Sequence, residues 1–141
     1  MIETSTQPYH VKKSSRSRIA ALWLSVLLVM TAIFLMSSVP GGKKPGDPFS
    51  NADKGEHFIV YGILAFTLYG AVGSTAGART RLFHAVAALV IAALYAVSDE
   101  VHQGLVPGRS RSPADLVADI IGASVVVLVM HVTNLMGGRK L

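Results

Sequence analysis

The chain contains no cysteine, which excludes disulfide bonds, a thiolate nucleophile, and any zinc or iron–sulfur site built from cysteine ligands. Charge is also scarce, since Asp, Glu, Lys and Arg make up 15% of the 141 residues, against about 25% in a typical soluble domain. Hydrophobic residues account for 51% of the chain. The few charges are grouped between long apolar runs, as they are in the sequence of an integral membrane protein.

The net charge of +5 and the isoelectric point near 9.8 would also fit a protein that binds nucleic acid. The basic residues, however, flank apolar runs and do not form one continuous polar face. Lys and Arg in such positions are the usual determinants of membrane topology. We therefore interpret the positive charge as a topological signal and predict no nucleic-acid partner.

Four apolar segments predict an all-α, polytopic membrane bundle of four transmembrane helices. Residues 19–39 form a run of 21 residues without a charge, which at 1.5 Å per residue matches a hydrocarbon core of about 30 Å. This run exceeds the usual signal-peptide core of about 7–15 residues, so we expect an uncleaved anchor. Ser112, Pro113 and Asp115 are typical of the start of a helix. We expect the remaining spans at about residues 57–78, 82–103 and 113–136.

Two polar segments lie outside these spans. Residues 1–18 are basic and lack periodicity, so we predict a disordered cytoplasmic tail that precedes a membrane domain at residues 19–138. Residues 40–51 are rich in glycine and proline and are predicted to form an irregular loop. Whether this loop covers a site stays open at the level of sequence.

Basic residues are unequally divided between the two sides of the predicted membrane. Eight lie on the side of the N-terminus: Lys12, Lys13, Arg16, Arg18, Arg79, Arg81, Arg139 and Lys140. Five lie on the other side: Lys43, Lys44, Lys54, Arg109 and Arg111. The richer side is expected in the cytoplasm, so we predict a multi-pass protein of the cell membrane with both termini cytoplasmic. Seven of the eight acidic residues, all except Glu3, then fall on the extracytoplasmic side.

This acidic enrichment coincides with polar residues at the ends of three predicted spans, which are our candidate site residues. Four open the second span: Asp53, Lys54, His57 and Tyr61. Three end the third span: Asp99, Glu100 and Gln103. Three precede or begin the fourth: Arg109, Asp115 and Asp119. Because all three segments meet the same membrane face, we expect them to form one site.

Helical spacing places these residues on defined faces. Asp53, His57 and Tyr61 follow at intervals of four residues and therefore share one helix face. Asp119 lies about one turn inside the fourth span, where an ionised carboxylate is costly unless it is paired or hydrated. We expect Asp119 to face the bundle interior and to meet a basic residue, either Lys54 or Arg109. Gly122, on the same face, would let a neighbouring helix approach closely.

The three polar segments resemble, in order, the VanZ-like family of bacterial membrane proteins. The resemblance covers about residues 50–128, and the residues that carry it are Asp53, Lys54, His57 and Tyr61; then Ser98, Asp99, Glu100 and Gln103; then Pro107, Gly108, Arg109, Asp115, Asp119 and Gly122. Many relatives carry Asn at the position of Asp119. The resemblance implies a VanZ-like membrane domain. The founding member is associated with low-level resistance to the glycopeptide teicoplanin, and no settled biochemical activity accompanies the family.

The candidate residues are of the types that build a general acid–base site at a membrane surface. In this hypothesis His57 transfers a proton, and Glu100 or Asp99 orients it. Arg109 holds an anionic head group, for which a guanidinium is a natural partner. The substrate would be an amphiphile such as a lipid-linked cell-envelope precursor, contacted by the other candidates: Asp53, Lys54, Tyr61, Gln103, Asp115 and Asp119.

Three other interpretations stay open, and with them the question of whether the protein is an enzyme. The site would bind a membrane lipid or a glycopeptide without chemistry, or take part in transport, for which four spans would require a homo-oligomer. A divalent metal could take nitrogen and oxygen ligands from Asp53, His57, Glu100 and Asp115. The nearby Lys54 and Arg109 disfavour a cation, and we predict no metal and no cofactor. In the last interpretation, the polar side chains hydrogen-bond only to one another. They would fix how the helices align and would bind no ligand.

Overall fold

The structure is a computed structural model that describes residues 16–41, 50–76 and 80–137, without the side chains of residues 50–53 and 135–137. The described residues form four helices and no strand: α1 (Arg16–Ser37), α2 (Ser50–Thr75), α3 (Arg81–Gln103) and α4 (Pro113–Gly137). All four helices are long and apolar enough to cross a membrane. The predicted all-α bundle of four transmembrane helices is therefore confirmed.

Two helices begin earlier than the apolar runs predicted. α1 starts at Arg16, within the predicted tail, and α2 starts at Ser50, within the predicted loop. Hydropathy marks only the part of a helix that lies in hydrocarbon, so the polar first turns of α1 and α2 gave no apolar signal. In α2 the first turn contains Asp53, which is favourable near a helix N-terminus. The rest of the predicted tail and most of the predicted loop, residues 1–15 and 42–49, lie outside the described residues.

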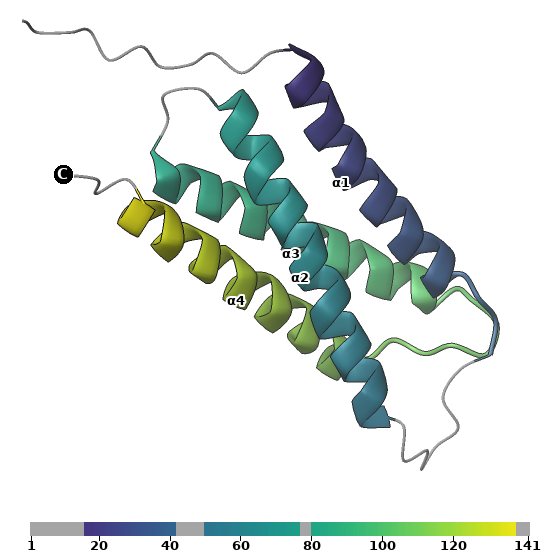
Figure 1. The fold of residues 1–141 in the computed structure, drawn as a ribbon. Coiled ribbons are helices and arrows are strands. Elements are labelled where there is room, and N and C mark those ends of the chain that lie inside the picture. Colours follow the sequence, from purple (N-terminus) through teal and green to yellow (C-terminus); the bar gives the residue numbers. More distant parts are fainter. Residues whose placement is uncertain (1–15, 42–49, 77–79, 138–141) are drawn as a thin grey trace, which may run out of the picture.

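The helices run alternately in opposite directions, so their ends gather at two ends of the bundle (Figure 1). At one end α1 and α3 finish while α2 and α4 begin, and we call this the polar end. α2 is the central helix, because it makes the most extensive contacts with the other three. The three segments of the candidate site, which begin α2, end α3 and begin α4, therefore meet at the polar end, as the sequence predicted.

A face of small residues on α3 packs into the bundle and leads to the polar end. The buried residues of this face recur at helical spacing: Ala85, Ala88, Ala92, Ala96, Asp99 and Gln103. Larger side chains of α2 fill the space opposite, and Tyr61, Leu64 and Leu68 are almost completely buried. The same face of α3 thus contributes small apolar residues to the middle of the bundle and buried polar residues in the last turn of the helix.

α2 and α4 cross at very short distance beside Gly122. A Cβ atom added at Gly122 would overlap the backbone carbonyl of Phe58, and one added at Gly62 would lie 3.1 Å from Val126 Cγ2. Small residues allow this approach between membrane helices, as the sequence predicted for Gly122. The crossing lies one turn from His57 and Asp119, so it sets the register in which these two side chains face each other.

We predict that Gly122→Ala lowers the free energy of unfolding by about 1–3 kcal/mol, because the new methyl group must push α2 and α4 apart. The measurement is denaturation in detergent micelles followed by far-UV circular dichroism. Gly55→Ala is the matched control, since no atom lies within 4 Å of a Cβ at Gly55. Equal stability of the two variants would contradict the inferred helix contact.

The absence of cysteine makes the predicted orientation directly measurable. We expect Ser110→Cys, in the loop before α4, to react with a membrane-impermeant maleimide in intact cells. Ser14→Cys, in the N-terminal segment, should react only after the cells are opened. The opposite labelling pattern would place the polar end in the cytoplasm and overturn the orientation predicted from charge.

Candidate functional site

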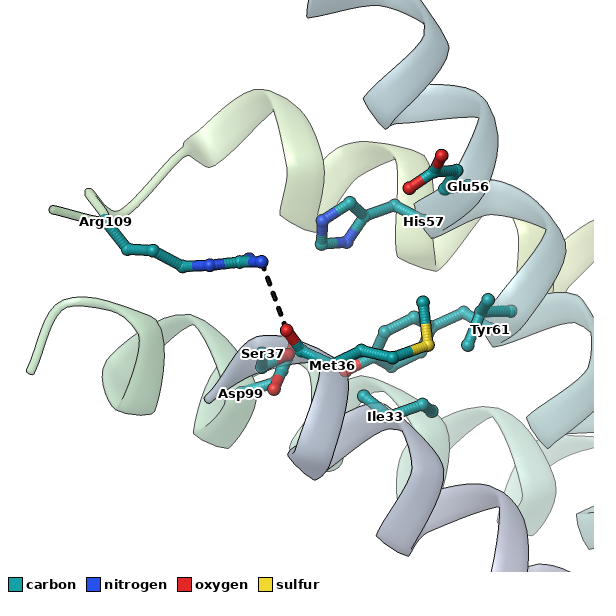
Figure 2. Close-up of a pocket in the computed structure, with 9 residues that line it drawn as sticks. Ile33, Met36, Ser37, Glu56, His57, Tyr61, Asp99 and Arg109 are labelled. Carbon is teal, nitrogen blue, oxygen red and sulfur yellow. Dashed lines mark hydrogen bonds between the residues drawn. The ribbon is translucent and has the colours of Figure 1, made fainter. Parts of the chain in front are cut away.

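A cavity of about 60 Å³ lies at the polar end, between α1 and α2 (Figure 2). We call it the cup and define it by the residues that line it: Ile33, Met36 and Ser37 of α1; Glu56, His57, Val60 and Tyr61 of α2; Asp99 of α3; and Arg109 of the loop before α4. The lining combines apolar side chains with polar and charged ones. The cup therefore suits a small polar group attached to an apolar chain.

His57 is oriented by a carboxylate from α4. Its Nδ1 lies 2.9 Å from Asp119 Oδ1, at hydrogen-bond distance, and Asp119 is 1% exposed. Its Nε2 lies 4.0 Å from Asp115 Oδ2, which is beyond hydrogen-bond distance. A neutral imidazole that donates from Nδ1 keeps Nε2 as an acceptor, and the same carboxylate stabilises the imidazolium once Nε2 has taken a proton.

These contacts correct two expectations from sequence. The partner of Asp119 is His57, and neither Lys54 nor Arg109 forms an ion pair with it among the described contacts. The carboxylate that contacts His57 is likewise Asp119. The sequence led us to expect Glu100 or Asp99 in that position. Spacing along one helix identifies a face, but only the rotation of α2 against α4 decides which side chains meet.

A glycine turn places Arg109 at the rim of the cup. The backbone N–H of Arg109 donates to the carbonyl of Val106 at 3.1 Å, and Gly108 between them has a φ of 78°. Pro107 followed by a left-handed glycine is the pattern of a type II β-turn. The Pro-Gly-Arg motif is therefore a local device that directs one guanidinium.

The Arg109 side chain fastens the end of α1. Its Nε donates to the carbonyl of Val39 at 3.2 Å, and its Nη2 donates to the carbonyl of Met36 at 3.1 Å (Figure 2). The Met36 carbonyl lies in the last turn of α1 and that of Val39 lies just beyond it, at the helix end where a cation is favourable. A guanidinium has five N–H donors, so donors remain for a ligand after these two bonds.

The other acidic candidates make structural contacts within the described residues. Asp99 accepts at Oδ2 from Gln103 Nε2 at 2.9 Å, and the same Nε2 lies 3.4 Å from Ser37 Oγ. Glu100 accepts at Oε2 from the backbone N–H of Ser112 at 2.6 Å. Ser112 in turn caps α4, as predicted from sequence. Asp99 lines the cup, whereas Glu100 holds the start of α4.

The cup therefore gathers part of the predicted constellation. Four candidates line it directly: His57, Tyr61, Asp99 and Arg109. Three more touch a lining residue: Gln103, Asp115 and Asp119. Glu100 and Lys54 do not line the cup, and the side chain of Asp53 lies outside the described residues.

Sequence reasoning missed the contribution of α1. Met36 and Ser37 line the cup, and Ser38 Oγ shares a hydrogen bond of 2.9 Å with His102 Nε2. The Tyr95 hydroxyl also donates to α1, at the carbonyl of Met30. The only signal was the pair of serines at the end of an uncharged run, and nothing in its spacing indicated a site.

Metal binding finds no support in the described residues, where no group of three or more His, Asp or Glu side chains is arranged to hold an ion. His57 has its Nδ1 engaged with Asp119, and Arg109 brings a positive charge to the same cavity.

The VanZ/LLP1 family model matches residues 21–134. The match covers most of the chain and extends to α1 the resemblance that the sequence motifs indicated for residues 50–128. No curated protein matches the chain. No solved structure matches it either.

The contacts of Arg109 predict that Arg109→Ala loosens the end of α1. Loss of hydrogen bonds from a charged donor typically costs about 1.5–3 kcal/mol, so the amides of Ser38 and Val39 should exchange with solvent at least about 10-fold faster. Hydrogen-exchange mass spectrometry measures this directly. Arg111→Ala is the matched control, because it removes an exposed basic residue from the same loop. Unchanged exchange in Arg109→Ala would contradict the fastening role.

Proposed function

This chain belongs to the VanZ/LLP1 family, and from that premise we propose that its cup recognises the anionic head group of a lipid-linked cell-envelope precursor. The founding member of the VanZ-like family is associated with teicoplanin resistance, and family membership links the chain to glycopeptide resistance in this way. The precursor is the proposed ligand because it combines a charged head with a hydrocarbon chain.

The observation that carries the proposal is the His57–Asp119 pair at the wall of a cavity that also contains Arg109. Burial of a carboxylate inside a membrane helix is costly, and such residues are functional candidates by default. Asp119 orients the imidazole, which leaves Nε2 as a proton acceptor for a hydroxyl or a water molecule on the ligand. Arg109 has the geometry to hold a phosphate or carboxylate beside it.

The position of the cup supports an amphiphilic ligand. Its polar wall lies at the end of the bundle, while Ile33, Met36 and Val60 continue the cavity along the membrane-spanning parts of α1 and α2. Met36, which lines the cup, is also 51% exposed. A head group at the cup can therefore keep its hydrocarbon chain in the bilayer, which a soluble substrate would not require.

Binding without chemistry is the second candidate, and one observation favours it. Asp99 is engaged with Gln103 and Glu100 with Ser112, so two carboxylates of the polar end already have structural partners. A cup that only holds a head group would sequester the precursor or a glycopeptide. In that case His57 would act as a hydrogen-bonding group and not as a base.

We predict that His57→Gln and Arg109→Lys each abolish the glycopeptide tolerance that the chain confers, at wild-type expression and membrane insertion. Glutamine keeps hydrogen bonding but cannot take a proton, and lysine keeps the charge but loses the planar fork. The measurement is the minimal inhibitory concentration of teicoplanin. His84→Gln, at the opposite end of α3, is the control and should leave tolerance unchanged. Full tolerance in both cup variants would refute the site.

Turnover separates the two candidates. Purified protein in lipid nanodiscs is incubated with a radiolabelled lipid-linked precursor, and the products are resolved by chromatography. A new product with wild type, absent with His57→Gln, identifies an enzyme. Stoichiometric binding without a product, weakened by Arg109→Lys, identifies a binder.

A further inference from the structure

The described hydrogen bonds at the polar end do not pair all of its buried carboxylate oxygens. Four carboxyl groups are at least nine-tenths buried there: Asp99, Glu100, Asp115 and Asp119. Such groups are costly in a low-dielectric environment unless cations or hydrogen-bond donors surround them. Two buried carboxylate oxygens, Glu100 Oε1 and Asp119 Oδ2, have no hydrogen-bond partner among the described residues. Within the described residues, these two oxygens are therefore available to a donor from a ligand.

The cup itself contains a buried hydroxyl that lacks a partner. Tyr61 is 1% exposed, lines the cup, and its Oη makes no hydrogen bond within the described chain. Figure 2 shows its side chain extending from α2 toward the side on which Ser37 and Asp99 lie. A buried, unpartnered phenol is unfavourable in an empty cavity and becomes favourable when a ligand bonds to it.

Three acceptors lie along one wall of the cup. The Asp99 carboxylate and Ser37 Oγ are neighbours, because both lie within reach of Gln103 Nε2, at 2.9 Å and 3.4 Å. Tyr61 Oη supplies the third acceptor. A carboxylate has about four lone-pair sites, so Asp99 can accept from a ligand while it keeps its bond to Gln103. This wall is built to receive N–H donors.

The positive charge of Arg109 lies at the rim of the cup. Arg109 keeps donors free after its bonds to the carbonyls of Met36 and Val39. A ligand that fits both features has an anion for the guanidinium and a cation for the carboxylate. A primary ammonium matches the wall, because its three N–H donors meet a carboxylate, a phenol and a serine hydroxyl. The volume of about 60 Å³ admits a group of that size.

We propose that the head group held by the cup is zwitterionic, with a primary ammonium seated between Asp99 and Tyr61 and a phosphate against Arg109. This inference deepens the proposed function and rests on it, since it names the chemical class of the head group: an aminoalkyl phosphate. A quaternary ammonium lacks N–H donors and does not fit the wall. A head group with only hydroxyls leaves the Asp99 charge uncompensated.

The test is calorimetric titration of the full chain in neutral detergent with three short-chain phospholipids: dihexanoyl phosphatidylethanolamine, phosphatidylglycerol and phosphatidylcholine. We expect phosphatidylethanolamine to bind about 10-fold more tightly than the other two, as one charge-assisted hydrogen bond provides. Asp99→Asn, which keeps an acceptor for Gln103, should remove this preference. Tyr61→Phe removes only the unpartnered hydroxyl and should weaken phosphatidylethanolamine binding severalfold.

Tyr69→Phe is the matched control for Tyr61→Phe, because Tyr69 Oη is also buried and unpartnered among the described residues but Tyr69 does not line the cup. Tyr69→Phe should leave phosphatidylethanolamine binding unchanged. Equal weakening by Tyr61→Phe and Tyr69→Phe, or an unchanged preference in Asp99→Asn, would overturn the proposal. A third outcome is that the three lipids bind with equal affinity and that Arg109→Lys weakens the binding of each. This outcome would overturn the ammonium site and leave the proposed function standing. Absence of binding by all three would also overturn the aminoalkyl phosphate assignment, whereas the proposed function is tested separately with the lipid-linked precursor.

Discussion

The backbone contact between α2 and α4 at Gly122 is the constraint on which the site depends. Only a residue without a Cβ lets the carbonyl of Phe58 come so close to α4. One turn away, the same approach brings His57 Nδ1 to 2.9 Å from Asp119 Oδ1. A carboxylate inside a membrane span needs such a partner, so helix packing and site chemistry are parts of a single arrangement.

α1 depends on the polar end in a different way. Most of its surface is exposed to the surroundings of the bundle, and its buried residues are Val26, Ile33 and Ser37. Hydrogen bonds from Arg109, together with the bond between Ser38 and His102, hold its last turn. Arg109 thus both lines the cup and holds the end of α1, a helix that contributes to the lining.

The spans were predictable because length and apolarity are local properties, and a bilayer accepts any helix that has both. The cap at Ser112 and the glycine at 122 were also readable, since each acts through its own backbone position. The pairing of Asp119 was not, because a spacing of four residues identifies a helix face but says nothing of the rotation of one helix against another. The part played by Met36 and Ser37 was hidden for a further reason, as uncharged residues at the end of a span carry no signal of a site.

The sequence by itself determined that this is a four-helix membrane protein with seven of its eight acidic residues on one side of the membrane. It did so because the energetic penalty for charge in hydrocarbon sorts residues along each helix, whatever the helix packs against. Tertiary structure alone decided that Asp119 orients His57, that Glu100 holds the start of α4, and that Arg109 spans the rim of a cavity lined by α1. These contacts depend on how four helices are rotated and how closely they cross, and close packing of side chains from distant segments sets both.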